Sequence, residues 1–160
     1  MRKITSLGLV VFFLLTAISI AFAGYKEEIA VAAKGNLPGA SVYEKAGTSP
    51  FFLLFDHKGR FMEAIQNPYK GEEGAQEEVA EFLASKGVTA IVAGSFGGPL
   101  LISELPPNGV VAPAKASGAP MVEAMKDEGI KAFVFHGSAR EAVKKVFQMR
   151  PENKLNDEVP

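Results

Sequence analysis

The sequence contains no cysteine and only two histidines among its 160 residues. Without cysteine the chain can form neither disulfides nor thiolate metal sites, and it lacks the residue that anchors exported lipoproteins to lipid. His57 and His136 form no His-x-x-x-His motif. The chain therefore offers no local sequence signature of a transition-metal site.

The chain also has no excess of basic residues, since 17 Lys and Arg stand against 18 Asp and Glu. Binding to nucleic acid or to a membrane surface would call for a basic patch. No G-x-G-x-x-G, phosphate-loop or Ser/His/Asp signature is present. Asp56 and Glu63 are explained by a turn and by a polar strand face. We expect neither nucleic-acid binding nor catalysis.

The first 23 residues have the pattern of a secretory signal peptide. Two basic residues precede an apolar run from Leu7 to Ile20, and Ala21-Phe22-Ala23 is an A-x-A cleavage signal. The alternative is a transmembrane anchor, but the run is interrupted by polar residues and is short for a span of about 20 residues. We predict cleavage after Ala23, giving a periplasmic or extracellular protein that is soluble and not stably inserted in a membrane.

Removal of residues 1–23 would leave 137 residues with a formal net charge of −3. This length suits one domain with its own core, which we place at residues 24–150. Residues 151–160 are polar and charged, and we expect them to form a flexible tail.

Residues 74–98 predict a helix, a buried strand and a glycine-rich turn in close succession. Ala75, Val79, Phe82 and Leu83 share one helical face, and Gly87 suits the helix end. The next segment, 88–93, is apolar without alternation, as in a strand covered on both faces. Open α/β sheets bind ligands at the carboxyl ends of such strands. The turn contains three glycines, Gly94, Gly97 and Gly98.

The remaining pattern predicts strands at 28–33, 51–55, 60–66 and 131–135, and helices beginning at Pro120 and, behind the capping box Ser138/Glu141, near 139. The proline-rich apolar segment 99–113 holds at best one short helix near 100–105. The order predicts a mixed, mostly parallel sheet of about five strands with helices on its faces. We expect one shared core made by Phe51, Leu53, Val79, Phe82, Leu83, Ile91, Val134, Val143 and Val146.

The order of several short motifs resembles the dinitrogenase iron-molybdenum cofactor biosynthesis domain family. The matching motifs are Ile29-Ala30-Val31-Ala32, Ser49-Pro50-Phe51-Phe52, Phe55-Asp56, Gly59, Asn67-Pro68, Gly74-Ala75, Phe82-Leu83, Gly87-Val88, Gly94, Glu123-Ala124-Met125, Gly129-Ile130, Gly137-Ser138 and Glu141-Ala142. The resemblance implies a ribonuclease H-like fold with three α/β/α layers. It also implies a nitrogenase cofactor carrier or accessory role, with an iron-molybdenum or iron–sulfur cluster as the cargo.

The chain departs from this family in two places and in its predicted location. Cofactor-carrying members commonly show His-Phe-Gly where this chain has Lys45-Ala46-Gly47. Between Gly97 and Ser117 this chain interposes its proline-rich segment, although the family helix could instead align with Pro99–Leu105. Nitrogenase assembly is cytoplasmic, whereas this chain carries an export signal.

Two hypotheses follow from these patterns. The first is an exported, non-enzymatic binding protein for an anionic metal cluster or oxyanion, held at the loops after residues 34, 94 and 136. The second is a protein-interaction module that docks through the apolar segment 99–113 and binds no small ligand. For the first hypothesis the candidate ligand-binding residues are Lys34, Lys45, Gly94, Gly97, Gly98, His136, Gly137 and Ser138.

Overall fold

The computed structural model describes residues 28–97, 107, 109–114 and 119–149. The predicted signal peptide, the helix near 100–105, Gly98, most of the segment 99–113 and the tail 151–160 lie outside these residues. The described elements, in chain order, are β1 (Glu28–Ala33), the 3-10 turn η1 (Ala46–Thr48), β2 (Phe51–Phe55), β3 (Phe61–Gln66), α2 (Gln76–Ser85), β4 (Val88–Ala93), β5 (Ala112–Pro113), α3 (Pro120–Asp127), β6 (Lys131–Val134) and α4 (Ala139–Met149).

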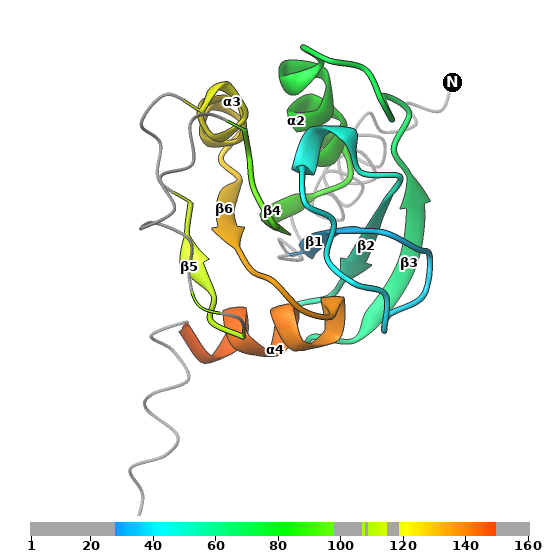
Figure 1. The fold of residues 1–160 in the computed structure, drawn as a ribbon, viewed down its shortest axis with the longest axis vertical. Helices are drawn as coiled ribbons and strands as arrows, with labels where there is room; N and C mark the ends of the chain where they lie inside the picture. Colours follow the sequence, from blue (N-terminus) through cyan, green and yellow to red (C-terminus); the bar gives the residue numbers. More distant parts are fainter. Residues whose placement is uncertain (1–27, 98–106, 108, 115–118, 150–160) are drawn as a thin grey trace, which may run out of the picture.

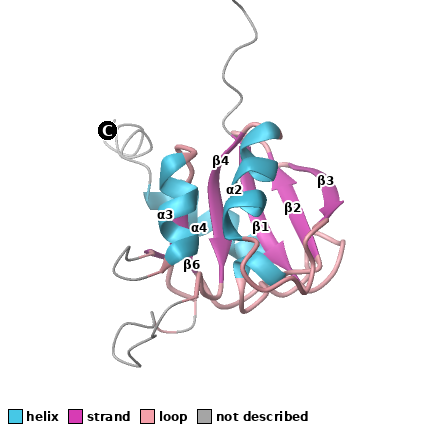
Figure 2. Ribbon diagram, turned by 90° about the horizontal axis from the view of Figure 1, so that it is seen from above, coloured by secondary structure: helices cyan, strands magenta, loops and turns pink. Residues whose placement is uncertain are grey.

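The described strands form one mixed sheet in the order β3-β2-β1-β4-β6-β5. β1, β4 and β6 are parallel, while β2, β3 and β5 join by antiparallel pairing. Helices α2 and α3 cover one face and α4 covers the other, which gives three layers (Figures 1 and 2). The predicted α/β/α architecture is confirmed. The sixth strand, β5, is two residues long and lies in the proline-rich segment where no strand was predicted.

The local signals read from the sequence explain where the elements end. Gly59 has φ of 75° in the turn between β2 and β3, and Gly87 and Gly129 have φ of 81° and 73° after α2 and α3. Such left-handed conformations favour glycine, because other residues are strained there. Pro120 lies in the first turn of α3, where its missing N–H costs no helical hydrogen bond.

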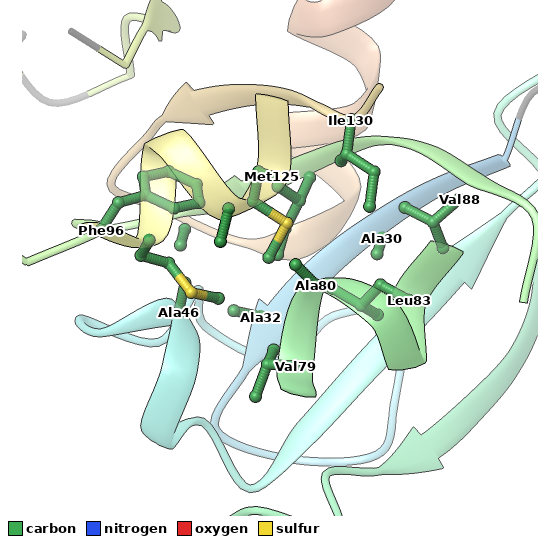
Figure 3. Close-up of a cluster of buried hydrophobic side chains, with 14 of the residues drawn as sticks. Ala30, Ala32, Ala46, Val79, Ala80, Leu83, Val88, Phe96, Met125 and Ile130 are labelled. Carbon is green, nitrogen blue, oxygen red and sulfur yellow. The ribbon is translucent and has the colours of Figure 1, made fainter. Parts of the chain in front are cut away.

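The apolar side chains form two cores, so the expectation of one shared core was wrong. Successive side chains of a strand point to opposite faces, and both faces of this sheet are covered. Val79, Leu83 and Ile91 belong to the cluster under α2 and α3, part of which Figure 3 shows. The second cluster, under α4, contains Leu53, Val143 and Val146. Phe82 and Val134 are half-buried beside the first cluster, and Phe51 is half-buried and belongs to neither.

Candidate functional site

The loops that follow β1, β4 and β6 meet at one edge of the sheet, as the sequence predicted. The three strands are parallel, so their carboxyl ends point the same way. Lys34 directly follows β1 and Gly94 directly follows β4. His136 comes two residues after β6, beside the start of α4. This edge is where open α/β sheets place their ligands.

The loop that follows β1 occupies this meeting point with its own segment 40–46. It lies across the ends of all three parallel strands and is held there by backbone hydrogen bonds, so the meeting point of the loops is occupied by protein. The bonds join Tyr43 N to Ala32 O (2.7 Å), Gly94 N to Tyr43 O (2.8 Å), Val42 N to Gly137 O (2.8 Å), Ala139 N to Ala40 O (2.9 Å) and Ala46 N to Ser95 O (3.0 Å).

The beginning of α4 is closed by its own capping box. Glu141 Oε2 accepts hydrogen bonds from the Ser138 N–H (3.1 Å) and the Ser138 hydroxyl (2.9 Å), and the Glu141 N–H donates to Ser138 Oγ at 3.3 Å. The Ser138 N–H and hydroxyl hold the pKa of Glu141 below its usual value. The N–H of Ser138 is thus already bonded to a carboxylate, and an external anion would compete with it.

An open cleft of about 380 Å³ lies next to this filled region, beside the beginnings of α2 and α3. Its lining includes Lys45 and Gly97 from the predicted set. Lys34, Gly94 and 136–138 are not among its lining residues, so the structure separates the predicted residues into two places. The complete lining is Lys45, Ala46, Gly47, Thr48, Glu72, Glu73, Gly74, Ala75, Gln76, Phe96, Gly97 and Met121.

The cleft has an apolar floor and a charged rim. Ala46, Phe96 and Met121 are buried, whereas Lys45, Glu72 and Glu73 are exposed. Among the described residues one ion pair is present, between Arg60 and Asp56, so Lys45 is not ion-paired with any of them. Its ammonium group is therefore available to a ligand.

The beginning of α2 contributes unbonded polar groups to the same cleft. Ala75, the N-cap residue, supplies no side-chain hydrogen bond to the first turn, and Ala75 and Gln76 line the cleft. The first N–H groups of a helix lack intrahelical partners and, with the helix dipole, favour anions. The α2 start and Lys45 can together hold an anion, while Glu72 and Glu73 oppose one through their charge.

The donor set of the cleft suits non-covalent binding and not coordination by nitrogen or thiolate ligands. Its lining includes no histidine, and the sulfur it offers is the Met121 thioether. Among the described residues no group of three or more His, Cys, Asp or Glu side chains is arranged to hold a metal ion.

No helix among the described residues has the length and apolar character needed to cross a membrane.

Sequence reasoning missed most of the cleft. Thr48, Phe96 and Met121 come from a 3-10 turn, the loop after β4 and a helix start, and no periodic pattern brings them together. One signal did point to the place: Lys45-Ala46-Gly47, which aligns with the His-Phe-Gly triplet of the resembling family, lines the cleft.

The comparisons with known proteins agree with this fold. A NifB candidate from Thermotoga, assigned to the DUF35 family, matches with a TM-score of 0.55 and 21% identity over 78% of this chain and 90% of its own. The apo orange protein from Desulfovibrio gigas matches with a TM-score of 0.56 and 19% identity over 77% and 88%. The protein PH0822 matches with a TM-score of 0.53 and 14% identity over 76% and 90%. At these identities the likeness concerns the fold.

A sequence comparison relates the amino-terminal part of the domain to one family. A search of curated proteins finds no significant match. The family model described as dinitrogenase iron-molybdenum cofactor matches residues 27–102, which include β1 to β4 and most of the cleft lining. This part of the chain is therefore similar to the dinitrogenase iron-molybdenum cofactor family.

Proposed function

We propose that this protein is an exported, non-enzymatic binding protein that carries an anionic metal cluster or oxyanion in the cleft between η1 and the start of α2. The observation that carries the proposal is the position of Lys45. Lys45 is exposed and lines a cleft that also contains an uncapped helix start. The match of residues 27–102 to the family model and the place of residues 45–47 in the lining support the same assignment.

The cleft replaces an imidazole with an ammonium group. Where carrier members of the family commonly have histidine, Lys45 supplies a full positive charge and three donors but cannot act as a metal ligand while protonated. The cargo would thus be held as an intact anion by charge and hydrogen bonds. The apolar floor would exclude water beneath it and strengthen these contacts.

Isothermal calorimetry with molybdate as the probe tests this proposal. Lys45→Ala should weaken binding about tenfold, because a hydrogen bond to a charged group contributes about 1.5–3 kcal/mol when buried and less at an exposed rim. Lys34→Ala is the matched control, since Lys34 belongs to the same loop but does not line the cleft. It should leave the affinity unchanged.

The two rim carboxylates provide a test of opposite sign. The double variant Glu72→Gln/Glu73→Gln removes two negative charges from the cleft and should strengthen molybdate binding. Both charge effects should shrink at high salt, because exposed charges are screened. If wild-type protein binds neither molybdate nor a reconstituted iron–sulfur cluster, or if Lys34→Ala and Lys45→Ala weaken binding equally, the assignment to this cleft fails.

Export has its own test. The basic start, the apolar run and the A-x-A signal support cleavage after Ala23. Amino-terminal sequencing of protein recovered from its own cells should therefore begin at Gly24. Recovery of intact Met1 in the membrane fraction would contradict this part of the proposal.

The interaction-module hypothesis is supported less by the described residues. Val111 is buried in the core under α4, and Ala112 and Pro113 pair with β6, so this part of the apolar segment packs on its own domain. Native mass spectrometry of the exported protein distinguishes the two ideas. A retained small ligand supports the carrier assignment, and a retained protein partner supports the module.

A further inference from the structure

Asn67 is a buried polar residue that is bonded directly to one cleft-lining residue and linked through Tyr69 to another. It is 5% exposed and follows β3 directly. Its Nδ2 donates a hydrogen bond of 2.9 Å to the carbonyl oxygen of Gly47, in the η1 wall. Its Oδ1 accepts a hydrogen bond of 3.0 Å from the Tyr69 N–H, at the beginning of the segment that leads to the opposite wall.

The second contact continues into the opposite wall through the backbone. The carbonyl oxygen of Tyr69 accepts a hydrogen bond of 3.0 Å from the N–H of Glu72, which lines the cleft. The N–H of Asn67 itself donates to the carbonyl oxygen of Pro50 at 3.1 Å, which fixes Asn67 to the beginning of β2. The side-chain amide of Asn67 thus joins the η1 wall to the loop before α2, and its backbone N–H joins both to the sheet.

The chemistry of the two partners fixes the orientation of this amide. The Gly47 carbonyl can only accept a hydrogen bond and the Tyr69 N–H can only donate one, so the site needs a donor and an acceptor on the same side chain. Asparagine meets this need with one flat group. An ionised aspartate has acceptors only and would set an oxygen against the Gly47 carbonyl.

We propose that Asn67 is the positioning residue of the cleft, setting the separation of Lys45 on one wall from the α2 start on the other. The inference rests on the proposed binding function of the cleft. Asn67 does not line the cleft and would not touch the ligand. It would act through the walls, and ligand affinity would depend on its amide even though no charge of the site changes.

Asn67→Asp is the informative variant, because it changes one donor into a group whose hydrogen-bonding capacity depends on pH. Burial and the facing Gly47 carbonyl should raise the pKa of the new carboxyl group above its usual value near 3.9. When protonated, the carboxyl group can donate to Gly47 as the amide does, and when ionised it cannot. Lys70 is the charged residue closest to Asn67 in the sequence, and Lys45, Glu72 and Glu73 line the cleft; these groups are the same in both proteins.

Molybdate calorimetry on wild type and Asn67→Asp at a series of pH values from 5 to 8 gives the first readout. At pH 8 the variant should bind about tenfold more weakly, and the ratio of the two affinities should return towards one as the pH falls. The ratio cancels the pH dependence of molybdate and of the shared cleft groups. Asn67→Ala should bind weakly at every pH, because it has no donor to recover.

Amide hydrogen exchange of the ligand-free proteins gives a readout that does not need a ligand. At pH 8, Asn67→Asp should exchange faster than wild type in segments 44–49 and 69–76, with β1 unchanged. Ser49→Ala is the matched control. Ser49 is also buried, but its Oγ makes no hydrogen bond in the structure, so its removal should leave both walls protected.

The outcomes separate the inference from the proposed function. A pH-independent affinity ratio, or faster exchange spread equally over β1 and the walls, would show that Asn67 only supports overall stability and would overturn the inference. If wild-type protein does not bind molybdate, the oxyanion assignment fails. The exchange experiment still decides whether Asn67 positions the walls.

Discussion

Gly94 and Glu44 lie so close together that only glycine fits at position 94. A Cβ atom on Gly94 would lie 2.9 Å from the Glu44 Cα, a separation that real side chains do not reach. The N–H of Gly94 also donates to the neighbouring Tyr43 carbonyl at 2.8 Å. The contact holds segment 40–46, and with it Lys45, against the end of β4.

Gly94→Ala should therefore destabilise the fold by about 1–3 kcal/mol, the usual cost of forcing extra volume into a packed site. Equilibrium denaturation in urea measures this cost. Gly39→Ala is the control from the same loop, because a Cβ at Gly39 would meet nothing within 4 Å. It should change the free energy of unfolding by less than about 0.5 kcal/mol. Equal effects of the two substitutions would contradict the close contact.

Gly94 also illustrates how far the sequence could be read. The glycines at 94 and 97 predicted a turn, and Gly97 does have φ of 80°. The role of Gly94 depends on Glu44, fifty residues earlier, and no local pattern records such an approach. The capping box of Ser138 and Glu141 was predictable because both partners lie within one helical turn.

The same distinction between local and distant contacts explains why the candidate site was predicted only in part. Because the preceding strands were expected to be parallel, the sequence predicted that the loops after residues 34, 94 and 136 would meet, and they do. Segment 40–46 of the first loop occupies their meeting point because of hydrogen bonds to residues far away in the sequence, such as Gly94 and Gly137. The cleft opens beside the predicted point, and of the predicted residues Lys45 and Gly97 line it.

Leu83 and Phe82 should differ in their contribution to stability. From the helical pattern alone, Phe82→Ala would be expected to lower the free energy of unfolding by about 3–5 kcal/mol. In the structure Leu83 is 0% exposed, whereas Phe82 is half-buried and has the Lys86 ammonium over its ring at 5.7 Å. Leu83→Ala should cost about 2–5 kcal/mol and Phe82→Ala less than Leu83→Ala. Urea denaturation of both variants checks the order, and the reverse order would mean that α2 is rotated.

Ser138 should matter for stability and not for ligand binding. Ser138→Ala removes the hydroxyl that accepts from the Glu141 N–H and should cost about 1 kcal/mol, as for other N-caps. Its affinity for molybdate should equal that of wild type, because Ser138 does not line the cleft. A loss of molybdate affinity without a loss of stability would instead indicate that molybdate binds at the beginning of α4.

Asp56 should make the hairpin of β2 and β3 sensitive to acid. Its Oδ1 accepts hydrogen bonds of 2.9 Å from the N–H groups of Arg60 and Lys58, and its Oδ2 accepts one of 2.7 Å from Arg60 Nε. Led by the Arg60 N–H, these contacts lower the pKa of Asp56 from 3.8 to about 2. The folded state therefore favours the ionised carboxylate.

The sign of the pH effect follows from this shift. A carboxyl group with a lowered pKa in the folded state stabilises the fold at pH values above its ordinary pKa, and the contribution is lost as the pH falls from about 4 to 2. The difference in unfolding free energy between wild type and Asp56→Asn should be largest near pH 6 and should shrink through this window. Glu63→Gln alters an exposed carboxylate of the same hairpin and is the matched control. A difference for Asp56→Asn that stays constant from pH 6 to 2 would show that the turn gains nothing from the charge of Asp56.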